Sequence, residues 1–315
     1  MLNSYLLLIS NALKASDNQK STNMNHKIII QFLIISGVLL LSCQSTKDTT
    51  TPPTDKVIKT AKKYKVNPRS GEKQLQNITH FDMKGKETKR VEYKKEAISR
   101  EVLFEYDEQG NQIKTIEKKG EETLTLGTYD YKENFKVHEK TPYGYTFFDR
   151  DDKGDLVAER AFNSDGTIDL FLFHKYKYEG EQLIAKLTTE QKEVGAKPKE
   201  RQLERFTYND KGKVMQRHLL SVYDERTFTN TYHSNGQLKQ TIEIAFKNKE
   251  KVVYHFNTNG KKTKVEVYRR KTTKDEFQLD LMNHWVYNEF GDLIEMKSER
   301  GGTVIRQTII ELEYY

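Results

Sequence analysis

The stretch Tyr-Asn-Asp-Lys-Gly-Lys-Val at residues 208–214 has the composition of a hairpin turn. An Asn at the start opens a type I turn, because its side chain bonds to nearby backbone N–H groups. The Gly then takes the positive-φ position that forms a G1 bulge. We therefore expect positive φ at Gly212, and equally at Gly236 and Gly260, which follow the same pattern.

The same spacing recurs along the chain. Of 17 glycines, eight follow a Phe or Tyr by four residues, whereas an aromatic frequency of 11% predicts about two. Three of the intervals between these glycines are 25, 24 and 24 residues, enough for two strands and two turns. The predicted turn glycines are Gly85, Gly110, Gly166, Gly180, Gly212, Gly236, Gly260 and Gly291.

The segments between these turns alternate as β-strands do. In residues 238–246, apolar residues and Gln240 occupy every second position, and Lys, Thr, Glu and Ala lie between them. The predicted fold class is therefore all-β: an antiparallel array of β-hairpin repeats with some 16 to 20 strands. A meander of that length curls or coils. We expect aromatics on its inner face and charges on its outer face.

Residues 24–43 have the pattern of a signal peptide. Met24 to Lys27 are a short basic start, and residues 28–41 contain only Gln31 as a polar residue. That apolar run is shorter than the ~20 residues of a membrane-spanning helix. It ends in Leu40, Leu41, Ser42 and Cys43, which resemble a bacterial lipoprotein lipobox, and the resemblance implies that Cys43 carries the acyl chains.

The predicted domains follow from this start. Residues 1–43 are a lipoprotein signal peptide with translation favoured at Met24, residues 44–70 a flexible Thr/Pro/Lys tether, and residues 71–315 the hairpin-repeat domain. Gln44, by resemblance to sorting in Gram-negative bacteria, implies the outer membrane. Lys47-Asp48 is similar to the export tag of Bacteroidetes surface lipoproteins, and the choice between the periplasmic face and the cell surface stays open.

Three segments resemble YD repeats of the Rhs/teneurin type, namely residues 106–113, 208–214 and 287–294. Residues 233–239, His-Ser-Asn-Gly-Gln-Leu-Lys, are similar to a MORN-variant repeat. The chain lacks the long, even array of large YD proteins. The resemblance implies a β-repeat surface of the kind used for envelope binding or scaffolding.

One segment has partial spacing for a metal site. Asp149, Asp151 and Asp155 lie in a run similar to a calcium loop, but Lys153 and Arg160 occupy positions that need acidic ligands. An acidic hairpin turn is favoured, and we predict no metal and no cofactor. The single Cys also excludes a disulfide framework.

No nucleotide-binding or nucleophile-elbow motif is present in the sequence. Lys and Arg number 53 against 46 Asp and Glu, with the signs interspersed, so we predict no nucleic-acid partner. The sequence favours a lipid-anchored, non-enzymatic surface that binds or scaffolds an unknown protein or glycan. The alternatives are a glycan-directed envelope enzyme, a lipid-handling or assembly factor with an apolar trough, and an immunity-like partner of a toxin.

Overall fold

The computed structural model describes residues 56–245 and 249–315, and their regular elements are twenty β-strands. In chain order these are β1 (Ile58–Val66), β2 (Lys73–Phe81), β3 (Glu87–Lys94), β4 (Ala97–Tyr106), β5 (Gln112–Lys119), β6 (Glu122–Lys132), β7 (Phe135–Thr141), β8 (Gly144–Arg150), β9 (Leu156–Asn163), β10 (Ile168–Glu179), β11 (Gln182–Gln191), β12 (Lys199–Tyr208), β13 (Val214–Ser221), β14 (Glu225–Tyr232), β15 (Leu238–Ala245), β16 (Glu250–Phe256), β17 (Lys262–Arg269), β18 (Gln278–Tyr287), β19 (Leu293–Arg300) and β20 (Thr303–Tyr314).

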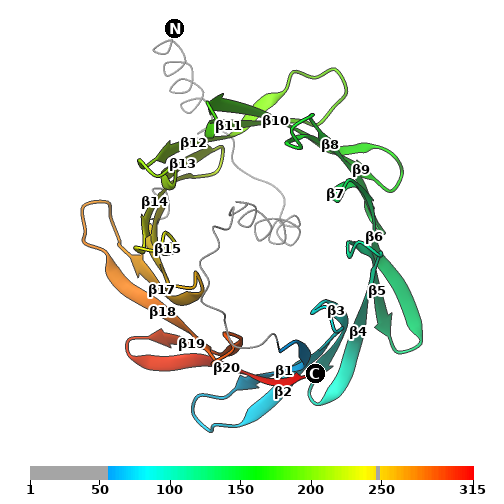
Figure 1. Ribbon diagram of the computed structural model, residues 1–315, viewed down its shortest axis with the longest axis vertical. Helices are drawn as coiled ribbons and strands as arrows, with labels where there is room; N and C mark the ends of the chain where they lie inside the picture. The colour runs from blue at the N-terminus through cyan, green and yellow to red at the C-terminus, as the bar shows by residue number, and fades with distance from the viewer. Residues whose placement is uncertain (1–55, 246–248) are drawn as a thin grey trace. The chain divides into compact units, whose positions relative to one another are not determined.

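The strands form one closed antiparallel barrel. Each strand pairs with the next along the chain, and β20 pairs with β1 from Glu313–Thr60 to Gln307–Val66. Figure 1 looks along this barrel and shows the strands following one another around the ring. The predicted all-β antiparallel meander is confirmed, and the sheet curls until its first and last strands pair and close the barrel.

The predicted end of the tether at residue 70 is wrong. Residues 58–66 form β1, which bonds to β2 on one edge and to β20 on the other. β1 contains four lysines, a composition typical of a solvated linker. Hydrogen bonds along both of its edges nevertheless keep it in the sheet, although it has few apolar residues. The signal peptide and Cys43 lie outside the described residues.

The barrel wall encloses a wide lumen. Twenty strands spaced about 4.8 Å apart and tilted by about 35–45° enclose a ring roughly 35–40 Å across between backbones. Side chains cannot fill that width, and none of the large ones in the described part of the chain is less than 2% exposed. The buried apolar residues are small and lie within the wall: Val66, Val91, Val102, Ala158, Ala245, Val253 and Val265.

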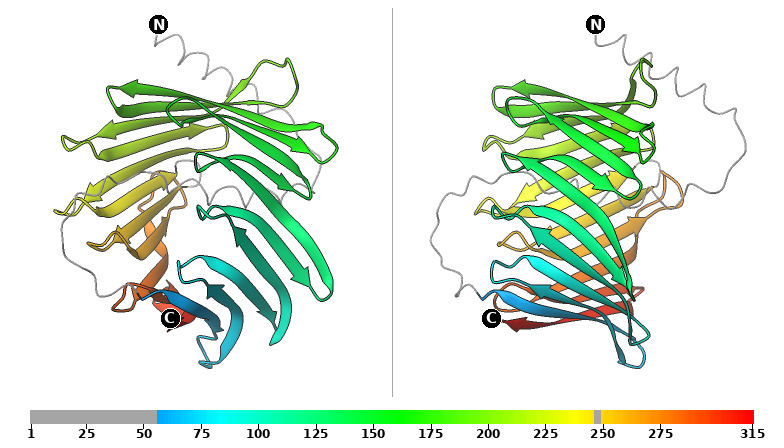
Figure 2. Two further views of the ribbon diagram at one scale, coloured as in Figure 1. Left: turned by 45° about the vertical axis from the view of Figure 1, so that its right-hand side comes forward. Right: turned by 90° about the vertical axis from the view of Figure 1, so that its right-hand side faces the viewer.

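Strand handedness decides which side chains face the lumen. Consider a β-strand of L-residues viewed with its C-terminal end at the top. Each residue whose side chain points toward the viewer then has its backbone N–H and C=O groups directed to the right. In the turn after β2, the backbone N–H and C=O groups of Asp82 bond toward β3. Viewed from the end of the barrel where this turn lies, successive strands follow one another counterclockwise (Figures 1 and 2). His80, two residues earlier, therefore points outward and Thr79 points inward. Directly paired residues of neighbouring strands point to the same face, so the pairing registers extend the inward and outward assignment to the other strands.

Charged residues occupy both faces, which differs from the expected aromatic inner face and charged outer face. Arg100, Glu92 and Glu117 form an ion-paired group on the inward face. On the outward face, Lys89 pairs with Glu101 at 2.7 Å. The difference arises because the wall has no solid core behind it, so each face meets a wide space rather than a second layer.

The two ends of the barrel are built differently. The turns after even-numbered strands make one end, the glycine rim: 82–86, 107–111, 133–134, 151–155, 180–181, 209–213, 233–237, 257–261 and 288–292. The turns after odd-numbered strands make the loop rim, with described turns 67–72, 95–96, 120–121, 142–143, 164–167, 192–198, 222–224, 270–277 and 301–302. Figure 2 shows the C-terminus and the start of β1 together at the glycine rim. Gly166, grouped by sequence with the other turn glycines, lies at the loop rim.

Most turns of the glycine rim share one local structure. In the turn after β12, Asn209 Oδ1 accepts the N–H groups of Lys211 and Lys213 at 3.0 and 2.9 Å. Gly212 donates its N–H to the Asn209 carbonyl at 2.9 Å. The φ angles of Gly212, Gly236 and Gly260 are 72°, 82° and 74°.

The repeated tyrosine links each hairpin of the glycine rim to the one before it. Tyr232 donates its hydroxyl to the Val214 carbonyl at 2.6 Å, two residues after the preceding turn glycine. Lys213 in turn donates to the Gly236 carbonyl at 2.7 Å and lies 5.5 Å from the Tyr232 ring centroid. We call this pair of contacts the tyrosine clasp. Equivalent hydroxyl bonds join Tyr106 to Glu87, Tyr176 to Leu156, Tyr208 to Leu183 and Tyr287 to Lys262.

The turn geometry predicts a strain effect at Gly212. A Cβ there would come within 4 Å of the Gln182 amide alone, at 3.6 Å, so the cost of a side chain is in the backbone. Gly212→Val should lower the free energy of unfolding by about 1–2 kcal/mol. Gly212→Asn is the control and should cost less, because Asn tolerates left-handed φ. Denaturant melts check this, and a valine variant as stable as wild type would sink the turn assignment.

Tyr176, which belongs to a tyrosine clasp, and the neighbouring Tyr178 predict alkaline weakening of the barrel. The bond from Tyr178 to Asp155 raises the pKa of Tyr178 to about 12, and burial raises the pKa of Tyr176 to about 12. Their stabilisation is complete below pH 10, the ordinary pKa of tyrosine, and is lost as the pH rises through the folded pKa. The denaturation midpoint should fall between pH 10 and 12, less steeply in Tyr178→Phe than in wild type. Equal slopes would contradict the assignment.

Candidate functional site

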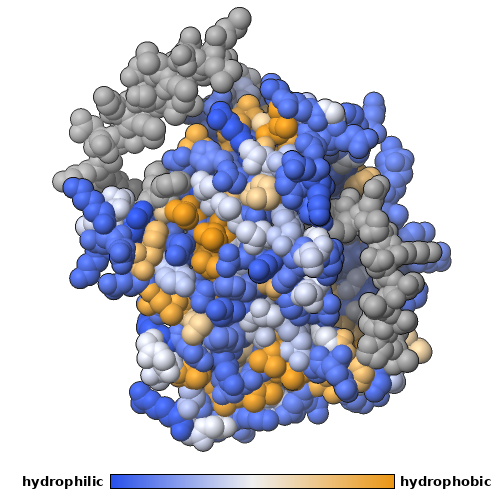
Figure 3. Space-filling view, turned by 60° about the vertical axis from the view of Figure 1, so that its left-hand side comes forward, coloured by the Kyte–Doolittle hydropathy of each residue, from blue (hydrophilic) through white to orange (hydrophobic). Residues whose placement is uncertain are grey.

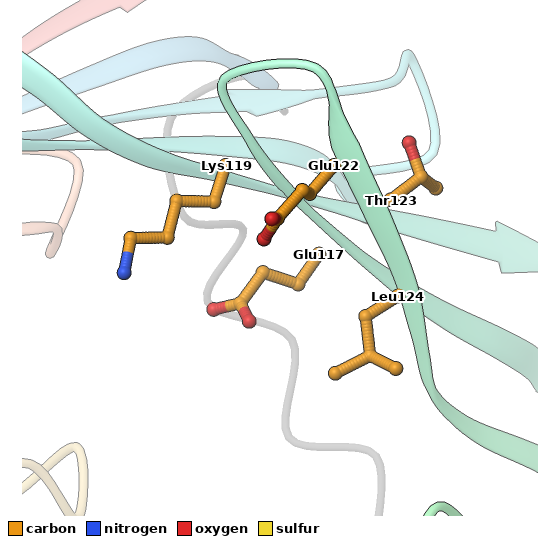
Figure 4. Close-up of a pocket in the computed structure, with 5 residues that line it drawn as sticks. All are labelled: Glu117, Lys119, Glu122, Thr123 and Leu124. Atoms are coloured by element: carbon orange, nitrogen blue, oxygen red, sulfur yellow. The ribbon is translucent and has the colours of Figure 1, made fainter.

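The inward face carries a series of ion-paired arginines. Arg100 donates to Glu92 Oε2 at 2.8 Å and to Glu117 Oε1 at 2.9 Å, which joins β3, β4 and β5. These two hydrogen bonds raise the pKa of Arg100 above its ordinary value. Figure 4 shows Glu117, Lys119 and Glu122 on one side of the β5–β6 hairpin, around a shallow pocket near the loop rim.

The same arrangement recurs across the lumen wall. Arg226 donates to Asp224 at 3.0 Å and to Glu243 at 2.7 Å. Glu243 also accepts the Tyr254 hydroxyl at 2.9 Å, and burial together with this carboxylate raises the pKa of Tyr254. The described lumen wall thus carries ion-paired charged groups on several strands. Its buried carboxylates are paired to arginines.

The three aspartates of the calcium-like run have separate partners. Asp149 accepts two bonds from Arg160, both at 2.8 Å. Asp151 Oδ1 accepts the N–H groups of Lys153 and Asp155, while Asp155 accepts the Tyr178 hydroxyl. Across residues 56–245 and 249–315, no three His, Cys, Asp or Glu side chains converge as metal ligands.

The outward face of β7 to β10 carries the largest cluster of aromatic rings. We call His138, Tyr145, Phe147, Phe162 and Phe171 the outer aromatic patch. His138 stacks on Phe147 with centroids 4.9 Å apart, and Tyr145 stacks on Phe162 at 5.0 Å. Phe171 meets Phe162 edge-on at 5.3 Å. Neighbouring rings thus touch across four strands, and Phe147 remains 37% exposed.

Charged groups border the outer aromatic patch. The Arg160 guanidinium lies 5.5 Å from the Phe147 centroid and is fixed by its paired bonds to Asp149. On the other side, His138 Nδ1 lies 2.8 Å from Asp130 Oδ2, and the Asp130 side chain is 72% exposed. Exposed ring surface beside polar groups suits a ligand with both C–H faces and hydroxyl or charged groups.

The sequence singled out only one member of this patch, Phe162, through its glycine spacing. The other members do not precede a glycine by four residues. The available signal was alternation: Tyr145 with Phe147, and Phe171 with Phe173, are spaced by two and so share a strand face. Cross-strand register, which brings those pairs together, is not readable from one sequence.

Membrane-spanning helices were also sought. In the part of the chain that the structure describes, no helix is long and apolar enough to cross a bilayer.

Comparisons with known proteins find the fold but no family. No family model matches the chain, and no curated protein matches it. A porin-like protein from Bacteroides uniformis is 13% identical, with 81% of this chain and 96% of that chain covered and a TM-score of 0.36. A second porin-like protein, from Bacteroides vulgatus, is 10% identical, with 83% and 99% covered and a TM-score of 0.28.

A third similar structure is TcdB2-TccC3, at 10% identity and a TM-score of 0.37. That match covers 76% of this chain but only 16% of the TcdB2-TccC3 chain. At these identities the likenesses concern the fold alone. Over its described residues the chain forms a twenty-stranded antiparallel barrel.

Proposed function

We propose that this protein is a lipid-anchored component of the bacterial outer membrane whose barrel stands in water and binds a protein or glycan without catalysis. One observation carries the proposal: charged side chains occupy both faces of the wall at mid-strand. The lipid anchor, the outer-membrane location and the ligand are each part of the proposal.

The outward face is unsuited to a hydrocarbon layer. Membrane-spanning barrels present an outward apolar band about 25 Å tall, and each Lys or Arg at its midplane costs roughly 2–4 kcal/mol. Here the outward mid-strand positions include the Lys89–Glu101 pair and His255, which lies 2.8 Å from Glu266. Figure 3 shows one side of this outer wall, where hydrophilic residues dominate and hydrophobic ones form separate spots. The barrel therefore needs another means of membrane attachment.

The N-terminal sequence supplies that means. A lipobox ending at Cys43 gives acyl chains, and two or more chains suffice for stable anchoring. Residues 44–57 then connect Cys43 to the first strand. Fourteen residues span at most about 46–50 Å, so the barrel stays close to the membrane without entering it.

The outer aromatic patch is the best candidate for the ligand-binding surface. It combines part-exposed ring faces with the fixed Arg160–Asp149 pair and the exposed Asp130 carboxylate. Sugars stack their C–H faces on aromatic rings and bond their hydroxyls to such polar groups. Protein side chains at interfaces use the same combination.

The anchor predicts how the protein fractionates. Wild type should pellet with outer membranes and resist carbonate washing. A chain whose residues 1–43 are replaced by a cleavable secretory signal should be released as a soluble, folded barrel, because charged groups lie on the outward face of the described strands. Retention of that chain in washed membranes would show that the barrel itself is integral and would contradict the proposal.

Protease treatment of intact cells places the barrel on one side of the membrane. Cleavage of anchored wild type in whole cells indicates surface display, whereas protection until the outer membrane is opened indicates the periplasmic side. Cys43→Ala is the anchoring control in both cases.

The patch predicts which aromatic residue matters for binding. On a glycan array and in cross-linking to envelope proteins, Phe147→Ala should weaken binding by about tenfold or more, as loss of a central aromatic contact does. Tyr268→Ala is the matched control, since Tyr268 is an outward aromatic on β17 beside Lys251. Equal binding by wild type and Phe147→Ala would remove the patch from consideration.

A further inference from the structure

The loop rim differs from the glycine rim in a way that the fold does not require. Its described turns include the two longest connections, residues 192–198 and 270–277. Its turn at Lys95-Glu96 holds two non-glycine residues at positive φ, 51° and 67°, as Glu133-Asn134 on the glycine rim also does. Binding surfaces are commonly made from loops of this kind on a rigid scaffold.

Exposed apolar side chains gather on the turns of this rim. Tyr143, Val194, Val222 and Tyr223 are 84%, 82%, 56% and 71% exposed. On the described turns of the glycine rim, Met83 alone is a large apolar residue exposed to a similar extent, at 74%.

Further exposed residues continue this distribution around the ring. Ile98, Leu124, Leu279 and Ile305 are 46–60% exposed and lie at the loop-rim ends of β4, β6, β18 and β20. A partner that covers all these positions must be as wide as the barrel.

We infer that the loop rim is a self-association surface, through which two copies of this chain stack rim to rim into one closed hollow body. A second copy has the required width and circular outline by construction. Two-fold symmetry also makes the same ring of positions meet its own counterpart.

Charge favours a second copy over a lipid surface. The loop-rim turns place opposite charges side by side, as in Lys95-Glu96, Lys192-Glu193 and Lys274-Asp275. Such a mixed rim is complementary to itself under a two-fold rotation. A rim that docks on anionic lipid would instead carry an excess of Lys and Arg.

The available area is sufficient. A ring about 120 Å in circumference and about 10 Å thick offers about 1,200 Å² on each barrel. The two rims together exceed the ~1,000 Å² expected of a specific interface.

The position of the anchor is compatible with this arrangement. The chain enters β1 at the glycine rim, so the loop rim lies at the end away from the lipid. Two stacked barrels lying along the membrane would have their tethers at opposite ends. Each tether, about 46–50 Å when extended, exceeds the radius of the barrel and reaches the membrane.

The test uses the full-length lipoprotein. A lysine-reactive cross-linker on intact cells, and native mass spectrometry of detergent-extracted protein, should both report a dimer for wild type. Val194→Asp with Tyr223→Asp should reduce the dimer by about tenfold or more, because the two copies would then bury four carboxylates in the interface. Met83→Asp, the matched substitution on the glycine rim, should leave the dimer unchanged.

The outcomes are distinct. Thermal melting of each variant confirms that the barrel is intact, since these side chains are exposed and outside the strands. A wild-type monomer in both measurements overturns the inference, as does equal loss of dimer in the Met83→Asp variant. A cross-link to lipid or to a different protein that is lost in the loop-rim variant assigns the rim to that partner instead. None of these results depends on the ligand proposed for the outer aromatic patch.

Discussion

The ladder between β1 and β20 is the constraint on which the rest of the barrel depends. Without it, a twenty-stranded meander would expose two long edges, each a template for pairing with another chain. The ladder joins residues about 250 positions apart, whereas every other strand pair joins sequence neighbours. It runs the length of β1, from Ile58 opposite Tyr314 to Val66 opposite Gln307. Closure therefore depends on a strand that composition alone assigns to a linker.

A barrel this wide also changes what the side chains must do. In a compact domain the apolar face of a sheet packs on another layer. Here the side chains on each face of the sheet are covered only by neighbouring side chains of the same face. Small residues such as Val91 and Val102 are buried in the wall, and long Lys, Arg and Glu stems shield them. The same stems carry their charges into pairs such as Arg100–Glu92. This explains how a chain with 31% charged residues forms a single ordered wall.

Much of the architecture could be predicted from local sequence, because hairpin turns are local events. The glycine spacing identified turns such as 209–213 and 257–261, and strand alternation gave the fold class and an upper strand number that matches the structure. Two features could not be predicted. β1 has no turn motif before it and is held by partners far along the chain. The outer aromatic patch is assembled by cross-strand register, which places Phe147 beside His138 and Phe162 through pairings that a single sequence does not encode.

The tyrosine clasp also gives the chain a direction. Each clasp hydroxyl, as from Tyr106, Tyr176, Tyr208, Tyr232 or Tyr287, reaches a carbonyl nearer the N-terminus. When the chain emerges N-terminus first, as in synthesis, the carbonyl acceptor of every clasp hydroxyl emerges before its donor. A growing wall can thus lock each hairpin that carries a clasp onto the preceding one as it arrives, and the order of emergence becomes the order of assembly.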